Sequence, residues 1–213
     1  MWCTPHTVLR YFRARKWDYA KTRAMIRATI KWREEMRPES ITWDAYVPQM
    51  ETGKCMVGLT TGCPHGRPIM LMDTRRDTTE CKKDLRASIK HLVYFMEVVA
   101  RHSDRGPMDT EGKMVWFVNQ TDYKSANAPP LRISLEVLGI LQNHYPERLG
   151  LAIMYNAGVA MNLFWSLVKP FIDPVTKTKI QFIKGPGGKG GFGGKKEGLT
   201  REHMMRVRDH RDG

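Results

Sequence analysis

Apolar residues recur every three or four positions in two long segments, which is the spacing of one face of an α-helix. The first segment runs from Asp18 to Met36, where Asp18 is a candidate N-cap and Pro38 lies just past the end. The second runs from Thr79 to His102 and is the longest periodic segment of the chain. The pattern therefore predicts two amphipathic helices in the first half of the sequence.

Two more helices are predicted in the second half. Pro129 and Pro130 open one that has its leucines on one side and ends near Tyr145, because proline suits the start of a helix. The other covers residues 158–169 and is apolar around almost its whole circumference. Such a helix is normally part of a hydrophobic core, although one face could instead meet a ligand or a membrane.

Four short apolar runs have the pattern of buried β-strands. They cover residues 68–72, 113–119, 151–156 and 180–183, and they alternate with the predicted helices. Strands that are apolar on both faces and alternate with helices are typical of a largely parallel sheet with right-handed crossovers. The sequence therefore predicts an α/β fold after a helical N-terminal segment. A short apolar run between Gly53 and Gly58 is left unassigned.

The composition is that of an ordinary globular protein, with 41% hydrophobic and 27% charged residues. No apolar run reaches the roughly 18 residues that span a bilayer. The first residues lack the features of a secretory signal, so we expect a cytoplasmic protein. The formal net charge of +13 favours an anionic surface, and charge alone does not choose between nucleic acid and a membrane.

No local motif indicates catalysis or a resident cofactor. The chain has no GxxxxGK[ST] or GxGxxG loop, no GxSxG elbow and no HExxH helix. Its cysteines form no CxxC pair and have no histidines at zinc-finger spacing, so we expect reduced thiols and no metal at Cys3, Cys55, Cys63 and Cys81. The enzyme alternative is a thiol nucleophile that pairs Cys55 or Cys63 with His65. We favour a protein with no catalytic residue and no cofactor.

Two charged segments flank the apolar helix at 158–169. The first, YPERLG, covers residues 145–150, and the second, KPFIDPVTKTK, covers residues 169–179. An acid, several bases and a hydroxyl beside a large apolar surface suit a ligand with a polar head and an apolar body, which indicates a lipid site. The alternatives are a solvated pair of Glu147 and Arg148 at a helix end, and lysines exposed on a strand in the second segment.

Five motifs resemble the CRAL-TRIO lipid-binding family, in its Sec-fourteen-like phosphatidylinositol transfer branch. They extend over most of the chain, from about Val8 to Ile183. The pairing of YPERxG with KPFxDPVTxxK is highly specific to the family. The motifs are LRYFRARKWD (9–18), IKWREE (30–35), QNHYPERLG (142–150), MYNA (154–157) and LVKPFIDPVTKTKI (167–180).

The resemblance implies an architecture. A small N-terminal helical lobe, here residues 1–45, would precede a lipid-binding lobe at 46–184, with a deep apolar pocket between the sheet and a mobile gate helix. Residues 158–169 fall at the position of the gate helix. The resemblance therefore favours a helix that meets a ligand and a membrane over one that is only part of the hydrophobic core. The N-terminal lobe is expected to be truncated, and residues 185–213 are expected to form a flexible, Gly/Lys-rich basic tail where the family usually has a closing segment.

The resemblance also implies roles for individual residues. The residues that would bind the inositol headgroup are Arg15, Lys16, Glu147, Thr176 and Lys179. The gate helix would touch the membrane through Leu163, Phe164, Trp165 and Val168. The candidate pocket-lining residues, for which core packing is an equally good explanation, are Met70, Met72, Leu92, Met96 and Met154. Asp173 is expected to shape the turn within the second charged segment, at 169–179.

The implied function is binding and transfer of phospholipid, above all phosphatidylinositol, by a monomer that docks transiently on anionic membranes. The DPVTxxK arrangement favours phosphatidylinositol over tocopherol or retinoids, and residues 117–124 do not match the hydroxyl residues associated with phosphatidylcholine. A sensor that presents phosphatidylinositol to a lipid kinase is the alternative within the family. Outside it, net charge alone favours a nucleic-acid-binding protein, for which no recognition motif is present.

Overall fold

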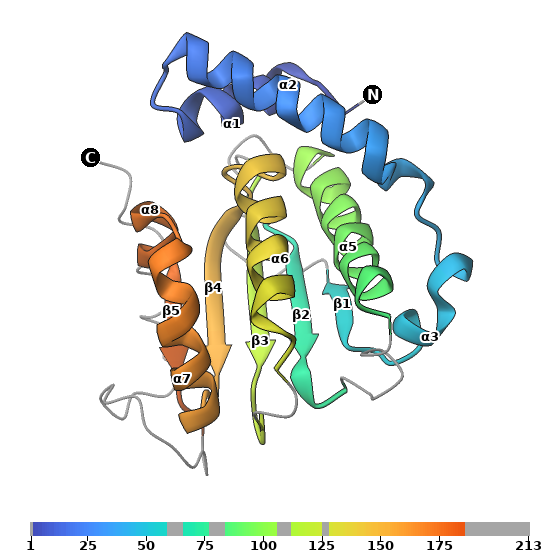
Figure 1. The fold of residues 1–213 in the computed structure, drawn as a ribbon, viewed down its shortest axis with the longest axis vertical. Helices are drawn as coiled ribbons and strands as arrows, with labels where there is room; N and C mark the ends of the chain where they lie inside the picture. The colour runs from blue at the N-terminus through green and yellow to red at the C-terminus, as the bar shows by residue number, and fades with distance from the viewer. Residues whose placement is uncertain (1, 59–65, 77–83, 106–111, 125–127, 186–213) are drawn as a thin grey trace.

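The computed structural model describes residues 2–58, 66–76, 84–105, 112–124 and 128–185, and every structural statement below concerns these residues. A mixed sheet forms the centre of the molecule, and helices cover one of its faces (Figure 1). A pair of helices from the N-terminal segment lies across one end of the sheet. All but the first residue of the predicted basic tail lies outside the described residues.

The sheet has five strands, arranged in the order in which they occur along the chain. Strands β2 to β5 are parallel to one another, whereas β1 pairs antiparallel with β2 at the edge. The predicted α/β fold with a largely parallel sheet is therefore confirmed, and β1 is the run that the sequence left unassigned. The strands are β1 (Cys55–Gly58), β2 (Ile69–Asp73), β3 (Met114–Asn119), β4 (Leu149–Tyr155) and β5 (Ile180–Ile183).

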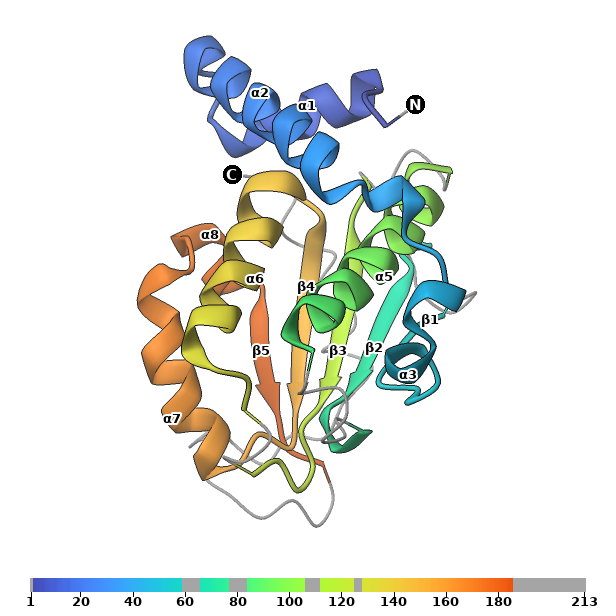
Figure 2. The ribbon, with the colours of Figure 1, turned by 45° about the vertical axis from the view of Figure 1, so that its right-hand side comes forward.

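Helices α5 (Leu85–Arg105), α6 (Leu131–His144) and α7 (Val159–Val168) connect the parallel strands in turn. Because each connection steps to the next strand in the same direction, crossovers of one hand place all three helices on the same face of the sheet, as Figure 2 shows. After α7 the chain turns through η6 (Lys169–Phe171) and α8 (Pro174–Thr178) before it enters β5. No helix among the described residues is both long and apolar enough to cross a bilayer.

The N-terminal segment forms α1 (Pro5–Ala14) and α2 (Tyr19–Met36). The Asp18 side chain accepts a hydrogen bond from the Lys21 amide, which confirms it as the N-cap of α2. The helix ends at Met36, and its C-cap residue Arg37 has a φ of 49°, in the left-handed region. The remaining short helices are η1 (Pro38–Ser40), η2 (Asp44–Tyr46), α3 (Val47–Met50) and η3 (Thr74–Arg76).

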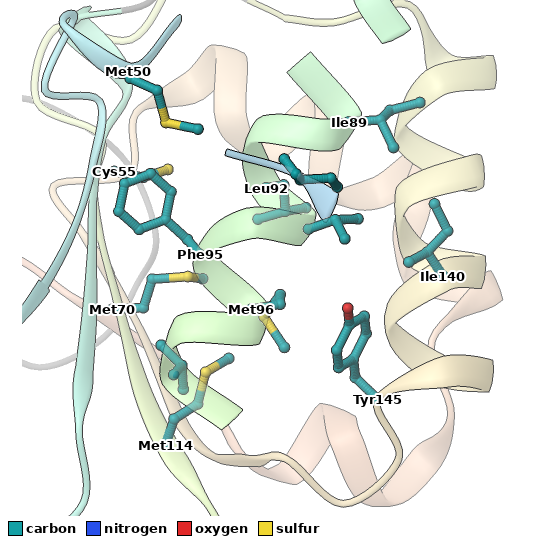
Figure 3. Packing of buried hydrophobic residues seen from close by; sticks show 13 residues of the cluster. Met50, Cys55, Met70, Ile89, Leu92, Phe95, Met96, Met114, Ile140 and Tyr145 are labelled. Atoms are coloured by element: carbon teal, nitrogen blue, oxygen red, sulfur yellow. The ribbon is translucent and has the colours of Figure 1, made fainter. Parts of the chain in front are cut away.

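The hydrophobic core lies between α5 and the sheet (Figure 3). Met70 of β2 and Met114 of β3 pack under α5, where Ile89 and Met96 are almost completely buried. Tyr145 extends the cluster beyond the end of α6. This packing accounts for the helical spacing seen in the sequence, although residues 79–83 of the predicted helix lie outside the described residues.

Hydrogen bonds and a ring stack fix α2 against the C-terminal end of α6. The Tyr11 hydroxyl donates to Thr29 Oγ1 at 3.1 Å, and Thr29 Oγ1 donates to the Asn143 carbonyl at 3.1 Å. The Trp32 indole stacks on the His144 ring, with centroids 4.4 Å apart and nearly parallel planes. The two N-terminal helices are therefore docked on the α/β lobe through aromatic and polar contacts.

A buried charge cluster reinforces this docking. The Arg33 guanidinium donates to both oxygens of Glu97 in α5, at 2.9 and 3.1 Å, and also to Glu39. The Tyr145 hydroxyl donates to the same Glu97 carboxylate at 2.7 Å. These bonds join α2, α5 and the segment that leads into β4, so the N-terminal helices are tied to the chain just before β4.

Acid should weaken the fold through His144. Burial, together with the nearby positive charge of Arg33, lowers the pKa of His144 from 6.5 to about 4. Between these values the unfolded chain binds a proton that the folded chain does not, so the free energy of unfolding falls as the pH falls. From about pH 7.5 to about pH 5 the expected loss is about 2 kcal/mol.

Urea unfolding of the wild type and of His144→Gln at both pH values checks this expectation. The variant has no imidazole to titrate at this position, so its loss over the interval should be smaller by about the same amount. An equal loss in the two proteins would show that other groups set the sensitivity to acid.

Candidate functional site

A pocket of about 1230 Å³ lies between the helices and the sheet. It is larger than the roughly 300–1,000 Å³ of typical small-molecule sites, and most of its lining side chains are apolar. Met70, a predicted lining residue, does not line it and is instead fully buried in the core under α5. The other predicted lining residues do line the pocket, namely Met72, Leu92, Met96 and Met154.

Helix α7 has two apolar faces, which accounts for its all-round apolar sequence. Phe164, Trp165 and Val168 line the pocket, and the Trp165 ring meets Phe182 of β5 edge-on with centroids 5.4 Å apart. Leu163 is outside the lining and is 65% exposed. Of the four predicted membrane contacts, one therefore lies on the outer face and three on the pocket face. Contact with a membrane stays a prediction.

Two exposed apolar side chains follow α7 in the chain, Phe171 in η6 and Val175 in α8. Both also line the pocket, so they lie at its opening. We call these two residues and the exposed apolar residues of α7 the outer stripe: Val159, Leu163, Leu167, Phe171 and Val175.

All five predicted headgroup residues line the pocket. Arg15 and Lys16 come from the turn between α1 and α2, Glu147 from the turn before β4, and Thr176 and Lys179 from α8 and its C-cap. Glu147 and Lys179 precede adjacent parallel strands, so they lie at the same end of the sheet, where these strands begin. The N-terminal helices lie across that end (Figure 1). We call this end of the pocket the charged mouth.

Glu147 and Lys179 form an ion pair within the charged mouth. Lys179 Nζ lies 3.3 Å from Glu147 Oε2, and both side chains are largely buried. The φ of Glu147 is 56°, a left-handed conformation that costs a non-glycine residue on the order of 1 kcal/mol. Pro146 and Arg148 on either side are buried, and they hold the strained residue in place.

Asp173 caps α8, in agreement with its expected role in the turn. Its carboxylate accepts a hydrogen bond from the Thr176 amide at 2.9 Å, and its own amide donates to Gln142 of α6 at 3.1 Å. The cap fixes the short helix that carries Thr176 and leads to Lys179. The alternative that placed the lysines of this segment on an exposed strand is wrong, because Lys177 lies within α8.

Arg148 has a structural role that the sequence did not predict. It is 6% exposed and donates to both oxygens of Asp104 at 2.6 and 2.7 Å, and to the Gly112 carbonyl at 3.0 Å. Arg10 of α1 donates to the same carboxylate at 3.0 Å. The interpretation of Glu147 and Arg148 as a solvated pair is therefore wrong, and no local signal in the sequence points to Asp104.

In the triad of Arg10, Asp104 and Arg148, the two arginines are buried and the Asp104 side chain is 26% exposed. Burial opposes the charge on Asp104, but hydrogen bonds and the positive charge of both arginines hold its pKa below the usual value. Burial and repulsion from Arg148 lower the pKa of Arg10 to about 10, which leaves it protonated at neutral pH. Gly112 is required beside the triad, because its φ is 69° and a Cβ would lie 2.8 Å from Arg10.

The described residues hold no cluster of three or more side chains able to ligate a metal. Cys55 is buried in the core, and the other members of the thiol–histidine alternative, Cys63 and His65, lie outside the described residues, as does Cys81. The five predicted headgroup residues offer the positive charge of Arg15, Lys16 and Lys179, the Glu147 carboxylate and the Thr176 hydroxyl. These groups bind phosphates and sugar hydroxyls by hydrogen bonding.

An α/β fold with a large apolar pocket and a charged mouth is typical of proteins that bind an amphipathic ligand. The comparison with known families agrees with this class. The CRAL/TRIO domain model matches residues 51–188, and the CRAL/TRIO N-terminal domain model matches residues 1–28. The chain belongs to the CRAL/TRIO family, and the resemblance inferred from its motifs is confirmed.

Two curated relatives and one solved structure are similar to this chain. A CRAL-TRIO domain-containing protein of Schizosaccharomyces pombe is 32% identical over 85% of this chain and 17% of its own length. Phosphatidylinositol transfer protein PDR17 of Saccharomyces cerevisiae is 30% identical over 85% of this chain and 53% of its own. The chain thus spans about half the length of PDR17 and less than a fifth of the length of the first relative. The crystal structure of Sfh5 shares the fold, with a TM-score of 0.68 at 14% identity over 83% of this chain and 63% of that one.

Proposed function

We propose that this protein binds phosphatidylinositol in its pocket and moves it between membranes. One observation carries the proposal: a large apolar pocket opens at a mouth where Glu147 and Lys179 pair beside Arg15, Lys16 and Thr176. The similarity to a yeast protein named as a phosphatidylinositol transfer protein supports it.

The charged mouth matches the two chemical parts of an inositol phosphate headgroup. Arg15, Lys16 and Lys179 donate to the phosphodiester, for which charge-assisted hydrogen bonds are the strongest. The Thr176 hydroxyl adds a neutral donor. Glu147 accepts hydrogen bonds from inositol hydroxyls while its pairing keeps Lys179 in position. A headgroup without hydroxyls offers Glu147 no such donors, which favours inositol.

The acyl chains set the energetic requirement for transfer. At roughly 0.8 kcal/mol per methylene, two long chains would cost about 25 kcal/mol in water. Met72, Met96 and Met154 present flexible, polarisable side chains that adapt to chains of different shape. The lipid therefore moves from the bilayer into the pocket without crossing water, so exchange takes place at the membrane surface.

Helix α7 serves as the gate. Its inner face, with Phe164 and Trp165, closes over the acyl chains when the protein leaves the membrane. Its outer stripe contacts the bilayer while the pocket is open. Net positive charge holds the protein near anionic lipids, at about 1 kcal/mol for each nearby Lys or Arg. Presentation of the lipid to a kinase would use the same pocket and mouth.

Native mass spectrometry after incubation with mixed-phospholipid vesicles tests the proposal. We expect one phosphatidylinositol per chain, and no comparable adduct after incubation with vesicles that lack this lipid. Retention of a different phospholipid in both experiments would reject the headgroup assignment. A folded chain that leaves the vesicles empty would reject lipid binding by this chain.

A further inference from the structure

The turn between α1 and α2 has an unusual and well-fixed backbone. Lys16 and Trp17 are consecutive non-glycine residues with φ of 51° and 64°. Each such residue costs on the order of 1 kcal/mol, so the turn persists only because its surroundings hold it. The Trp17 amide donates to the Phe12 carbonyl at 2.8 Å, and the Asp18 amide donates to the Arg15 carbonyl at 3.0 Å. The turn therefore presents its side chains in one defined arrangement.

What the turn presents is a pair of exposed aromatic side chains. Trp17 is 64% exposed although its ring stacks on Phe12 with centroids 5.6 Å apart, and Tyr19 is 69% exposed. An exposed apolar residue is common on protein surfaces, but a strained turn that holds an indole in solvent requires a reason. Tryptophan and tyrosine are the residues that settle at the headgroup level of a bilayer, because each combines an apolar ring with a polar tip.

The aromatic pair lies beside the charged mouth. Arg13 and Lys16, its neighbours in the chain, line the same pocket as Val175 and Thr176 of α8. Figures 1 and 2 both show the α1–α2 turn at the same end of the molecule as α8. The exposed end of the outer stripe, at Phe171 and Val175, therefore lies on the α8 side of the mouth, and the aromatic pair lies on the α1–α2 side.

The charges around the turn match an anionic surface. Lys16, Arg23 and Arg27 are exposed on the turn and along α2. The acid at this place, Asp18, is already paired with Lys21 at 2.9 Å. Exposed aromatic rings surrounded by cations suit the headgroup region of a bilayer that contains anionic lipid.

We infer that the α1–α2 turn is a membrane anchor in which Trp17 and Tyr19 enter the headgroup region of an anionic bilayer. With the end of the outer stripe it makes a second point of contact, and two contacts on opposite sides of the mouth turn the mouth toward the membrane. The purpose of this orientation rests on the proposed lipid transfer, whereas the anchoring itself does not.

Partition onto vesicles tests the anchor. The probe is phosphatidylcholine vesicles with and without phosphatidylserine, and the proteins are the wild type and the double variant Trp17→Ala, Tyr19→Ala. We expect the double variant to partition roughly tenfold more weakly onto the anionic vesicles. The matched control is Trp43→Ala, since Trp43 is also exposed but packs against Tyr94 and does not line the pocket. It should partition like the wild type.

A second measurement follows the fluorescence of Trp17 itself. Brominated lipids quench tryptophan fluorescence at short range, so they should quench the wild type more than Trp17→Phe on anionic vesicles. Equal quenching, or unchanged partition of the folded double variant, would overturn the anchor. Pocket loading, followed by native mass spectrometry, reports separately on lipid transfer. Partition that depends on Trp17 in a chain that retains no lipid would keep the anchor and reject the proposed function.

Discussion

Replacing Lys16 and Lys179 together with alanine should abolish phosphatidylinositol binding and leave the fold intact. In the proposed site each lysine would donate a charge-assisted hydrogen bond to the phosphodiester, and such a bond is worth about 1.5–3 kcal/mol. Loss of Lys179 also leaves the Glu147 carboxylate, 3.3 Å from it, facing the phosphate without its counter-charge. One substitution should therefore weaken binding by roughly 10- to 100-fold, and the two together should remove it.

Native mass spectrometry and transfer of labelled lipid between vesicles measure this loss. Lys169→Ala is the matched control, because Lys169 is an exposed lysine of the same segment that does not line the pocket. Retention of any lipid with a different headgroup should be unchanged in the double variant. Equal loss of every lipid would point to a damaged pocket, and undiminished phosphatidylinositol binding would place the headgroup elsewhere.

Replacing Arg148 with alanine should lower the free energy of unfolding by about 3–5 kcal/mol. The substitution leaves Asp104 partly buried with only Arg10 as a partner, and it removes the donor to the Gly112 carbonyl. Removing one partner from a largely buried charge cluster is among the most costly changes a single substitution can make. The effect also reaches the mouth, because Arg148 fixes the backbone next to Glu147.

Denaturant unfolding followed by circular dichroism checks this value against a matched control. Arg75→Ala removes an arginine that also donates two side-chain hydrogen bonds to an aspartate, Asp73, at 2.9 and 2.7 Å. Arg75 is half exposed, so its loss should cost less than about 1 kcal/mol. Similar costs for Arg148 and Arg75 would show that burial of the triad contributes little.

The parallel strands were predictable because a strand buried on both faces leaves an uninterrupted apolar run. Residues 114–118 of β3 are such a run, and the predicted bounds of the strand were correct to within one residue. Strand β1 was missed because it ends at Gly58 and exposes Met56 at the sheet edge. Helix α8 was missed because five residues are too few to show helical spacing.

The candidate site was predictable only as far as its motifs extend. Glu147 and Lys179 fall within two motifs, and the fold pairs them across 32 residues of chain. Asp104 belongs to none, and its pairing with Arg148 spans 44 residues, so spacing along the chain carries no sign of it. The roles of the headgroup residues, and the division of the chain near residue 45, stay predictions.

At Glu147 the left-handed backbone favours glycine, whereas the proposed ligand site requires a carboxylate. Glycine adopts a φ of 56° without steric cost, although part of that gain is lost to the greater freedom of the unfolded chain. A glycine there would nevertheless delete the carboxylate that pairs with Lys179. At this position the residue that suits the backbone and the residue that suits an inositol ring are different amino acids.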